Sequence, residues 1–312
     1  MTETAFHLVG HDEAMREIKT AFASGRMHHA WLLTGIEGIG KATLAKHIAG
    51  FVLAGAEKLV AAETHPDMLT IRRPTDDKTG EQKNIIPVDE ALKVSTFLRK
   101  TATHGGWRVV IIDDAHALNR NAQNAILKII EEPPPRTLIL ITVTTPGALL
   151  PTIRSRCRVL PLAPLEPAHM HTILHASAPQ LSTDDVKALI DLSGGSIGFA
   201  LKILRSEVLP LYRETLAILD GLPQLDIPRL HKLADQIARK ADAESFDVLT
   251  ALLTDRLRRA VHDEATATPV GRVDLALQLW DKTRATFAVA DRAHLDRKLA
   301  FINAVTDIRA AV

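Results

Sequence analysis

A short apolar run, a glycine-rich turn and an amphipathic stretch follow one another between residues 30 and 52, and they constrain the fold more than any other feature of the sequence. "AWLLT" (Ala30–Thr34) has the length and character of a buried strand. The turn after it, "GIEGIGK", matches G-x-x-x-x-G-K, with Gly35 at one end and Gly40 and Lys41 at the other. The apolar stripe of the following helix consists of Leu44, Ala45, Ile48, Ala49 and Val52. Strand, glycine loop and helix in this order predict a phosphate-binding loop in a parallel α/β sheet.

The chemistry of this loop depends on where its donors point. Backbone N–H groups around Gly38 would converge on one point, to which the helix N-terminus adds partial positive charge and Lys41 adds a full one. The alternative is a glycine-rich turn that only joins strand to helix. Ala42 stands where a serine or threonine hydroxyl would hold magnesium, and Thr43 points about 100° further round the helix. We therefore expect a weakened metal site.

A second strand delivers two carboxylates. In "VVIIDD" four apolar residues, Val109–Ile112, lead to Asp113 and Asp114 at the carboxyl end of the strand, where α/β proteins bind ligands. Asp113 is a candidate magnesium ligand. The alternative is a pair of carboxylates that caps the next helix or solvates the strand end.

The remaining apolar runs complete the α/β part. Residues 67–71 and 138–143 are further strand candidates, and a helix is expected after the capping residue Asn119 and before Pro133–Pro135. Residues 73–84 are expected to be a solvated loop, and their sequence says little about chemistry. Beyond Pro161 the β-rich runs end, and amphipathic helical patterns continue.

Composition excludes several classes. The 312 residues are enough for two or three domains, and 38 Lys and Arg against 37 Asp and Glu give a net charge of +1, unlike a strongly basic nucleic-acid binder. The single cysteine, Cys157, excludes an internal disulfide and a four-cysteine zinc module. We find no secretory leader and no apolar stretch long enough to span a membrane, so we expect a cytoplasmic protein with no membrane partner.

Three stretches in a fixed order resemble a known family. They are "GIEGIGK", then "VVIIDDAHALNRNAQNAILKIIEEPPP", then "TTPGALLPTIRSRCR". Together they resemble the clamp-loader branch of the AAA+ ATPases, and the resemblance runs from "RMHHAWLLTG" through "GGSIGFAL". The C-terminal helices match only in being helical and in the expected place.

The resemblance implies an α/β plus all-α fold. Its parts are an AAA+ P-loop domain with a parallel sheet at 1–163, a small helical lid at 164–207 and a C-terminal helical collar for oligomerisation at 208–312. It also implies partners: other clamp-loader subunits in a hetero-pentamer, the sliding clamp, and primer-template DNA reached through the assembly, within the bacterial DNA polymerase III holoenzyme.

The resemblance assigns the site residues as well. Arg156 of "SRC" is the residue expected to reach the neighbouring subunit's ATP as an arginine finger. Arg154, Arg156 and Arg158 alternate, and the residues alone would favour a solvated stripe on an extended segment. The predicted nucleotide-binding set is degenerate and consists of Gly35, Gly38, Gly40, Lys41, Thr43, Asp113, Asp114 and Thr144.

Departures from the family pattern argue against hydrolysis. Gly198 sits where active relatives carry an arginine, and Asp114 replaces a longer glutamate. With Ala42, these predict that the chain alone is not a competent ATPase. No cofactor is required, and binding of ATP or ADP with magnesium stays open.

No metal site is predicted. Residues 51–68 lack the cysteines of the zinc module that relatives carry, so no zinc is expected. His28 and His29 are expected to face different ways, and the resemblance places them near the nucleotide base. His171 and His175 are expected to lie on a solvated helix face.

The sequence therefore predicts a clamp-loader subunit that lends Arg156 to a motor neighbour during loading of the sliding clamp. Two alternatives stay open: an active motor-type ATPase that uses Lys41, Asp113 and Asp114, and a nucleotide-dependent DNA-binding adaptor outside replication.

Overall fold

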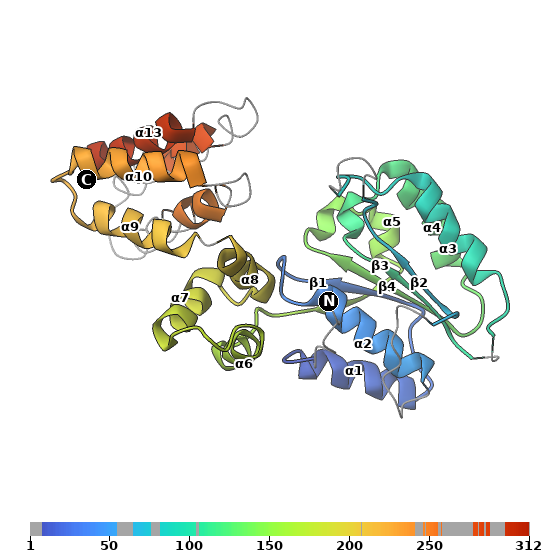
Figure 1. Ribbon diagram of the computed structural model, residues 1–312. Helices are drawn as coiled ribbons and strands as arrows, with labels where there is room; N and C mark the ends of the chain where they lie inside the picture. Colours follow the sequence, from blue (N-terminus) through green and yellow to red (C-terminus); the bar gives the residue numbers. More distant parts are fainter. Residues whose placement is uncertain are drawn as a thin grey trace, which may run out of the picture. The chain divides into compact units, whose positions relative to one another are not determined.

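The chain divides into two compact units, Met1–Phe199 and Ala200–Val312, in the computed structural model (Figure 1). The three predicted domains stay a prediction. The structure describes residues 8–54, 65–75, 82–103, 106–206, 208–240, 246, 248–254, 257, 277–279, 281–283, 285–287 and 297–311.

The first unit is built on a five-stranded sheet in the order β2-β3-β4-β1-β5, with every pair parallel. Its strands are β1 (Ala30–Thr34), β2 (Met68–Ile71), β3 (Arg108–Ile112), β4 (Thr137–Val143) and β5 (Arg158–Pro161). The first four agree with the predicted runs. The fifth was not predicted; it is a four-residue edge strand that ends at Pro161, and its only buried residue is Leu160.

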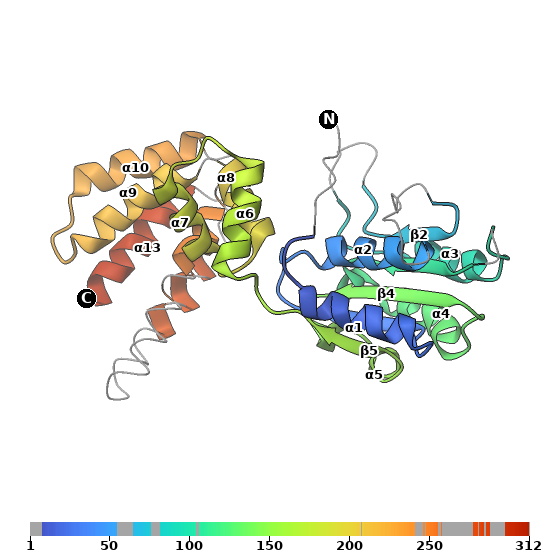
Figure 2. The same cartoon turned by 90° about the horizontal axis from the view of Figure 1, so that it is seen from below.

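Helices cover both faces of the sheet. The α-helices that begin in the first unit are α1 (Asp12–Ala23), α2 (Lys41–Leu53), α3 (Val88–Leu98), α4 (Arg120–Glu131), α5 (Pro151–Arg154), α6 (Pro167–Ser177), α7 (Thr183–Ser193) and α8 (Ile197–Arg205), the last continuing into the second unit. α1 and α2 pack side by side on one face, and α3 and α4 pack on the other (Figure 1 and Figure 2).

The helix between β3 and β4 forms for the reasons predicted. The Asn119 side chain accepts a hydrogen bond from the Ala122 N–H at 2.8 Å, so it caps α4. Ala122, Ile126 and Ile129 are buried against the sheet. The helix ends before the prolines, which cannot continue it.

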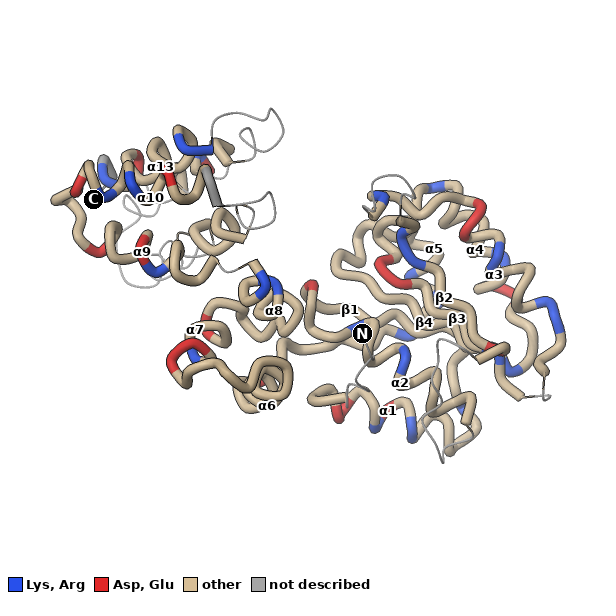
Figure 3. The backbone as a smooth tube through the Cα atoms, viewed as in Figure 1, with Lys and Arg blue, Asp and Glu red and all other residues tan. Residues whose placement is uncertain are grey.

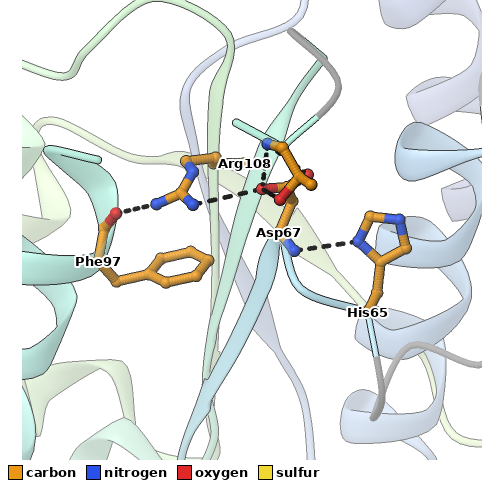
Figure 4. Close-up of polar contacts among 5 residues, drawn as sticks. His65, Asp67, Phe97 and Arg108 are labelled. Carbon is orange, nitrogen blue, oxygen red and sulfur yellow. Dashed lines mark hydrogen bonds and ion pairs between the residues drawn. The ribbon is translucent and has the colours of Figure 1, made fainter. Parts of the chain in front are cut away.

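A buried ion pair holds the start of β2 against β3 (Figure 4). The Asp67 carboxylate accepts hydrogen bonds from the backbone N–H and hydroxyl of Thr103 and pairs with Arg108 at 3.3 Å. Arg108 also donates to the Phe97 carbonyl and lies over the Phe97 ring, 4.3 Å from its centroid. The Asp67 N–H donates to the His65 ring, so this corner of the sheet is tied together by side chains.

The second unit is helical in its described residues. Its long helices are α9 (Leu209–Asp220), α10 (Ile227–Lys240) and α13 (Arg297–Ala311). Arg229 pairs with Glu214 at 2.7 Å and links α10 to α9, and Lys298 pairs with Asp235 at 2.7 Å and links α13 to α10.

Charges of both signs are spread along the described helices and loops of each unit (Figure 3). This distribution agrees with the small net charge. Across the residues that are described, none of the helices has the length and apolar character needed to cross a membrane.

Candidate functional site

Several predicted site residues meet at one edge of the sheet. The glycine loop follows β1, Asp113 follows β3 and Thr144 follows β4. Because these strands are parallel, their carboxyl ends share one edge, which is where open α/β sheets bind ligands.

Lys41 is buried in this edge and bound to its own loop. Its side-chain nitrogen Nζ donates to the Gly35 carbonyl at 2.9 Å, the Ile36 carbonyl at 2.8 Å and the Thr144 hydroxyl at 3.3 Å. An ammonium group has three donors, so all of them are engaged within the chain. Burial lowers the pKa of Lys41, and nearby carboxylates, Asp114 foremost, oppose that shift.

The two aspartates are also engaged within the chain. The Thr142 hydroxyl donates to Asp113 at 2.6 Å and accepts from the Asp114 N–H at 3.0 Å. The Asp114 carboxylate pairs with Arg73 at 2.9 Å. Arg73 lies in the stretch that was predicted as a solvated loop, and its guanidinium neutralises this carboxylate.

The first turn of α8 and the residue before it close over the glycine loop. The Ser196 hydroxyl donates to the Glu37 carbonyl at 2.7 Å, and the Gly198 N–H donates to the Gly38 carbonyl at 2.8 Å. Gly38 has a φ of +77°, which favours glycine, and a Cβ added at Gly198 would lie 2.8 Å from the Gly38 Cα. Gly198 was predicted only to lack a positive charge, but its missing side chain also permits this backbone contact.

In this arrangement, most of the groups that would meet a magnesium nucleotide have partners within the chain. The Lys41 donors that would meet phosphate are taken up by loop carbonyls and Thr144, and the loop backbone at Gly38 is covered by Gly198. Ala42 offers no oxygen to a metal, and Arg73 occupies the Asp114 carboxylate. No chemical step through a bound nucleotide follows from this arrangement.

Arg156 lies on the exposed turn between α5 and β5. One guanidinium nitrogen pairs with the Glu131 carboxylate at 3.0 Å, and another donates to the Thr152 carbonyl at 3.1 Å. Its side chain is 41% exposed. The turn is not extended, and Arg158 begins β5 and pairs with Glu17 at 2.7 Å instead. The three arginines therefore do not form a stripe on an extended segment, and that alternative is wrong.

Arg156 lies at the amino ends of the parallel strands, and Lys41 lies at their carboxyl ends. β5 begins at Arg158, which is aligned with Trp31 near the start of β1, whereas the glycine loop follows the end of β1. Five residues of strand span about 16 Å. Arg156 is thus remote from the phosphate loop of its own chain.

His28, His29 and Cys157 make packing contacts in the first unit. His28 and His29 precede β1, at the opposite end of that strand from the glycine loop, and their rings stack 4.4 Å apart instead of facing different ways. Burial, together with the charge of His28, lowers the pKa of His29. Burial raises the pKa of Cys157 to about 11, as expected for a packing residue.

Metal binding finds no support in the described residues, which contain no group of three or more His, Cys, Asp or Glu side chains that could hold an ion. His171 and His175 stack at 6.2 Å on α6 without a further ligand in that described set. Of the stretch 51–68, in which no zinc was expected, residues 55–64 lie outside the described residues, so the absence of zinc stays a prediction.

The parallel sheet, the glycine loop, the paired aspartates and the helices that follow define a P-loop protein of the AAA+ class. Residues 10–166 match the family model described as "DNA polymerase III, delta subunit". The chain belongs to this family of clamp-loader subunits, in its delta prime branch.

Individual relatives agree with the family. DNA polymerase III subunit delta' of Pseudomonas aeruginosa is 36% identical over 233 residues, an alignment that covers 70% of this chain and 66% of the relative, just under two thirds of its length. The Escherichia coli subunit delta' is 29% identical over 306 residues, covering 93% of this chain and 88% of the relative.

The fold likeness extends beyond the first unit. The crystal structure of a DNA polymerase III gamma subunit-related protein from Thermotoga maritima has a TM-score of 0.51 at 17% identity, covering 96% of this chain and 99% of that chain. At this identity the likeness concerns the fold alone.

Sequence reasoning missed several residues that shape the site. They are Arg73, Glu131, Thr142 and Ser196. Glu131 and Ser196 lie inside stretches that carried the family resemblance, so a signal was present for them. Arg73 and Thr142 act through partners more than 25 positions away, which no local pattern indicates.

Proposed function

We propose that this clamp-loader subunit does not hydrolyse ATP itself and supplies Arg156 in trans to ATP bound by a neighbouring motor subunit. One observation carries the proposal: Arg156 is exposed at the edge of the sheet opposite the phosphate loop of its own chain. A guanidinium at that edge can serve a phosphate only if the phosphate belongs to another subunit.

The value of such an arginine is electrostatic. An arginine finger neutralises charge that develops on the transferred phosphoryl group, an effect of roughly 10³- to 10⁵-fold in rate. This corresponds to about 4–7 kcal/mol of activation free energy. The proposal does not require this chain to bind or hydrolyse ATP. This agrees with the hydrogen bonds of Lys41 to its own loop and with the ion pair between Arg73 and Asp114.

The same proposal sets the partners and the location. The subunit joins motor and other loader subunits in a hetero-pentamer, and the assembly loads the sliding clamp onto primer-template DNA in the cytoplasm. The relatives named as DNA polymerase III subunits support membership of this complex. A net charge of +1 suits a subunit whose assembly shares the phosphate contacts.

Substitution of Arg156 tests the catalytic assignment. In the assembly reconstituted with its motor subunits, we expect Arg156→Ala to leave assembly intact and to slow DNA-stimulated ATP turnover several-fold, because the ATP that Arg156 serves loses its arginine finger. Arg154→Ala is the matched control, since Arg154 is also exposed and its side chain has no ion pair with any described residue. Unchanged turnover in an intact Arg156→Ala assembly would remove the assignment.

The isolated chain separates this proposal from the alternatives. We expect no phosphate release from purified protein with magnesium and ATP. Turnover that Lys41→Ala abolishes would establish a motor-type ATPase instead. Capture of an assembly without loader subunits would favour an adaptor outside replication.

Nucleotide binding has its own measurement. A crystal soaked with magnesium and a non-hydrolysable ATP analogue should retain the bonds from Lys41 to its own loop. Electron density for a triphosphate with a six-coordinate magnesium in that loop would contradict the proposal.

A further inference from the structure

Glu131 occupies a position that its own helix does not favour. It is the last residue of α4, where the helix already concentrates the partial negative charge of its free carbonyls. A carboxylate at the C-terminal end of a helix lacks the favourable interaction with the helix dipole that it would have at the N-terminal end. The contact with Arg156 at 3.0 Å gives this carboxylate an opposite charge, so the position of Glu131 is explained by its partner.

The guanidinium of Arg156 is held from two sides. Nη1 donates to the Thr152 carbonyl at 3.1 Å, and Nη2 meets Glu131 Oε1 at 3.0 Å. A guanidinium has five N–H donors, so these contacts leave donors available on a group whose direction is already set. The Arg156 side chain is 41% exposed, so a partner that covers this turn can contact it.

We propose that Glu131 is a positioning residue for Arg156, which it holds in the orientation that reaches the phosphate of a neighbouring subunit. The inference rests on the proposed function of Arg156. A free arginine has many rotamers, and each contact that restricts them lowers the entropy lost when the guanidinium meets its target. Small misplacements of a catalytic group cost rate, so orientation affects turnover more than binding.

The test uses the reconstituted assembly with saturating primed DNA. The kcat and KM for ATP are measured for Glu131→Ala, Glu131→Gln, Arg156→Ala and the Glu131→Ala/Arg156→Ala double variant. Glu132→Ala is the control, because Glu132 is the next residue, is exposed, and has no side-chain partner in the described structure.

We expect Glu131→Ala to lower kcat roughly three- to five-fold with little change in KM, the scale of one exposed ion pair. Glu131→Gln keeps an acceptor oxygen and should recover part of the loss. Glu132→Ala should match the wild type. In the Arg156→Ala background, Glu131→Ala should have no further effect.

Each other outcome has a distinct meaning. If Arg156→Ala slows turnover but Glu131→Ala does not, the inference is overturned and the proposed function stands. If Arg156→Ala has no effect, the proposed function fails and the inference with it. An equal loss from Glu131→Ala with and without Arg156 would show a purely structural role. Should Glu131→Ala fail to assemble, unchanged kcat in the isosteric Glu131→Gln would overturn the inference.

Discussion

At the scale of residues, two buried cations of the first unit satisfy their charge in different ways. Lys41 donates to carbonyl oxygens of its own loop and a hydroxyl, and burial lowers its pKa. Arg108 pairs with the Asp67 carboxylate and lies on the Phe97 ring. Of the two, only Arg108 is held by an ion pair, and its partner is Asp67. Removal of the Asp67 charge would leave Arg108 buried without its partner, so the stability of the first unit should depend on Asp67.

Asp67 also links stability to pH. Burial alone would raise the pKa of Asp67, but hydrogen bonds from Thr103 and the charge of Arg108 together hold it below its usual range. A carboxyl whose folded pKa is depressed stabilises the protein above its unfolded pKa of about 3.9, and this contribution is lost as the pH falls through the folded pKa.

We expect Asp67→Asn to lower the free energy of unfolding by about 3 kcal/mol at pH 7, because Arg108 stays buried without its charged partner. The difference from wild type should shrink below pH 4. Urea titrations at several pH values measure it, with Glu132→Gln as an exposed control. If the difference in unfolding free energy between wild type and Asp67→Asn stayed constant below pH 4, the ion pair of Asp67 with Arg108 would not be its cause.

At the scale of elements, the first turn of α8 and the glycine loop lie in backbone contact. Ser196 and Gly198 each donate one hydrogen bond to the loop, at Glu37 and Gly38. A helix normally gains from alanine in place of glycine, by about 1 kcal/mol. Here the backbone of the loop takes the space that an alanine side chain would need.

We expect Gly198→Ala to destabilise the protein by about 1–3 kcal/mol despite the higher helix propensity of alanine, because its Cβ would lie 2.8 Å from the Gly38 Cα. Gly147→Ala is the matched control, since a Cβ there would meet nothing within 4 Å. Chemical denaturation measures both variants. A neutral or stabilising Gly198→Ala would indicate that the turn and the loop separate easily.

At the scale of the whole molecule, each of the two compact units has its own buried residues. In the first unit, Ile126 on α4 is 1% exposed and packs in the core between the helix and the sheet. In the second, Phe301 on α13 is also 1% exposed. Chains with separate cores commonly depart from two-state unfolding.

We therefore expect two calorimetric transitions. Ile126→Ala should lower the midpoint of one and Phe301→Ala the midpoint of the other, each through a loss of about 2–5 kcal/mol in its own core. Heat capacity scans of both variants make the assignment. A single transition that both substitutions move equally would mean that the units unfold together.

The sequence by itself determined the elements with strong local signals. Four strands, the glycine loop and the cap of α4 were predictable because apolar periodicity, glycine spacing and an asparagine cap act over a few residues. The set Gly35, Lys41 and Asp113 followed from the same signals, since parallel strands bring their carboxyl ends to one edge.

Tertiary structure alone decided which atoms engage each other at the site. The ion pair of Arg73 with Asp114, that of Glu131 with Arg156, and the bond from Ser196 to Glu37 join residues 25 to 159 positions apart. Hydrogen bonds and ion pairs depend on ångström distances set by how helices and strands pack, and sequence periodicity holds no record of those distances. The edge strand β5 was missed for a related reason: its place comes from pairing with β1, and its own residues are mostly exposed.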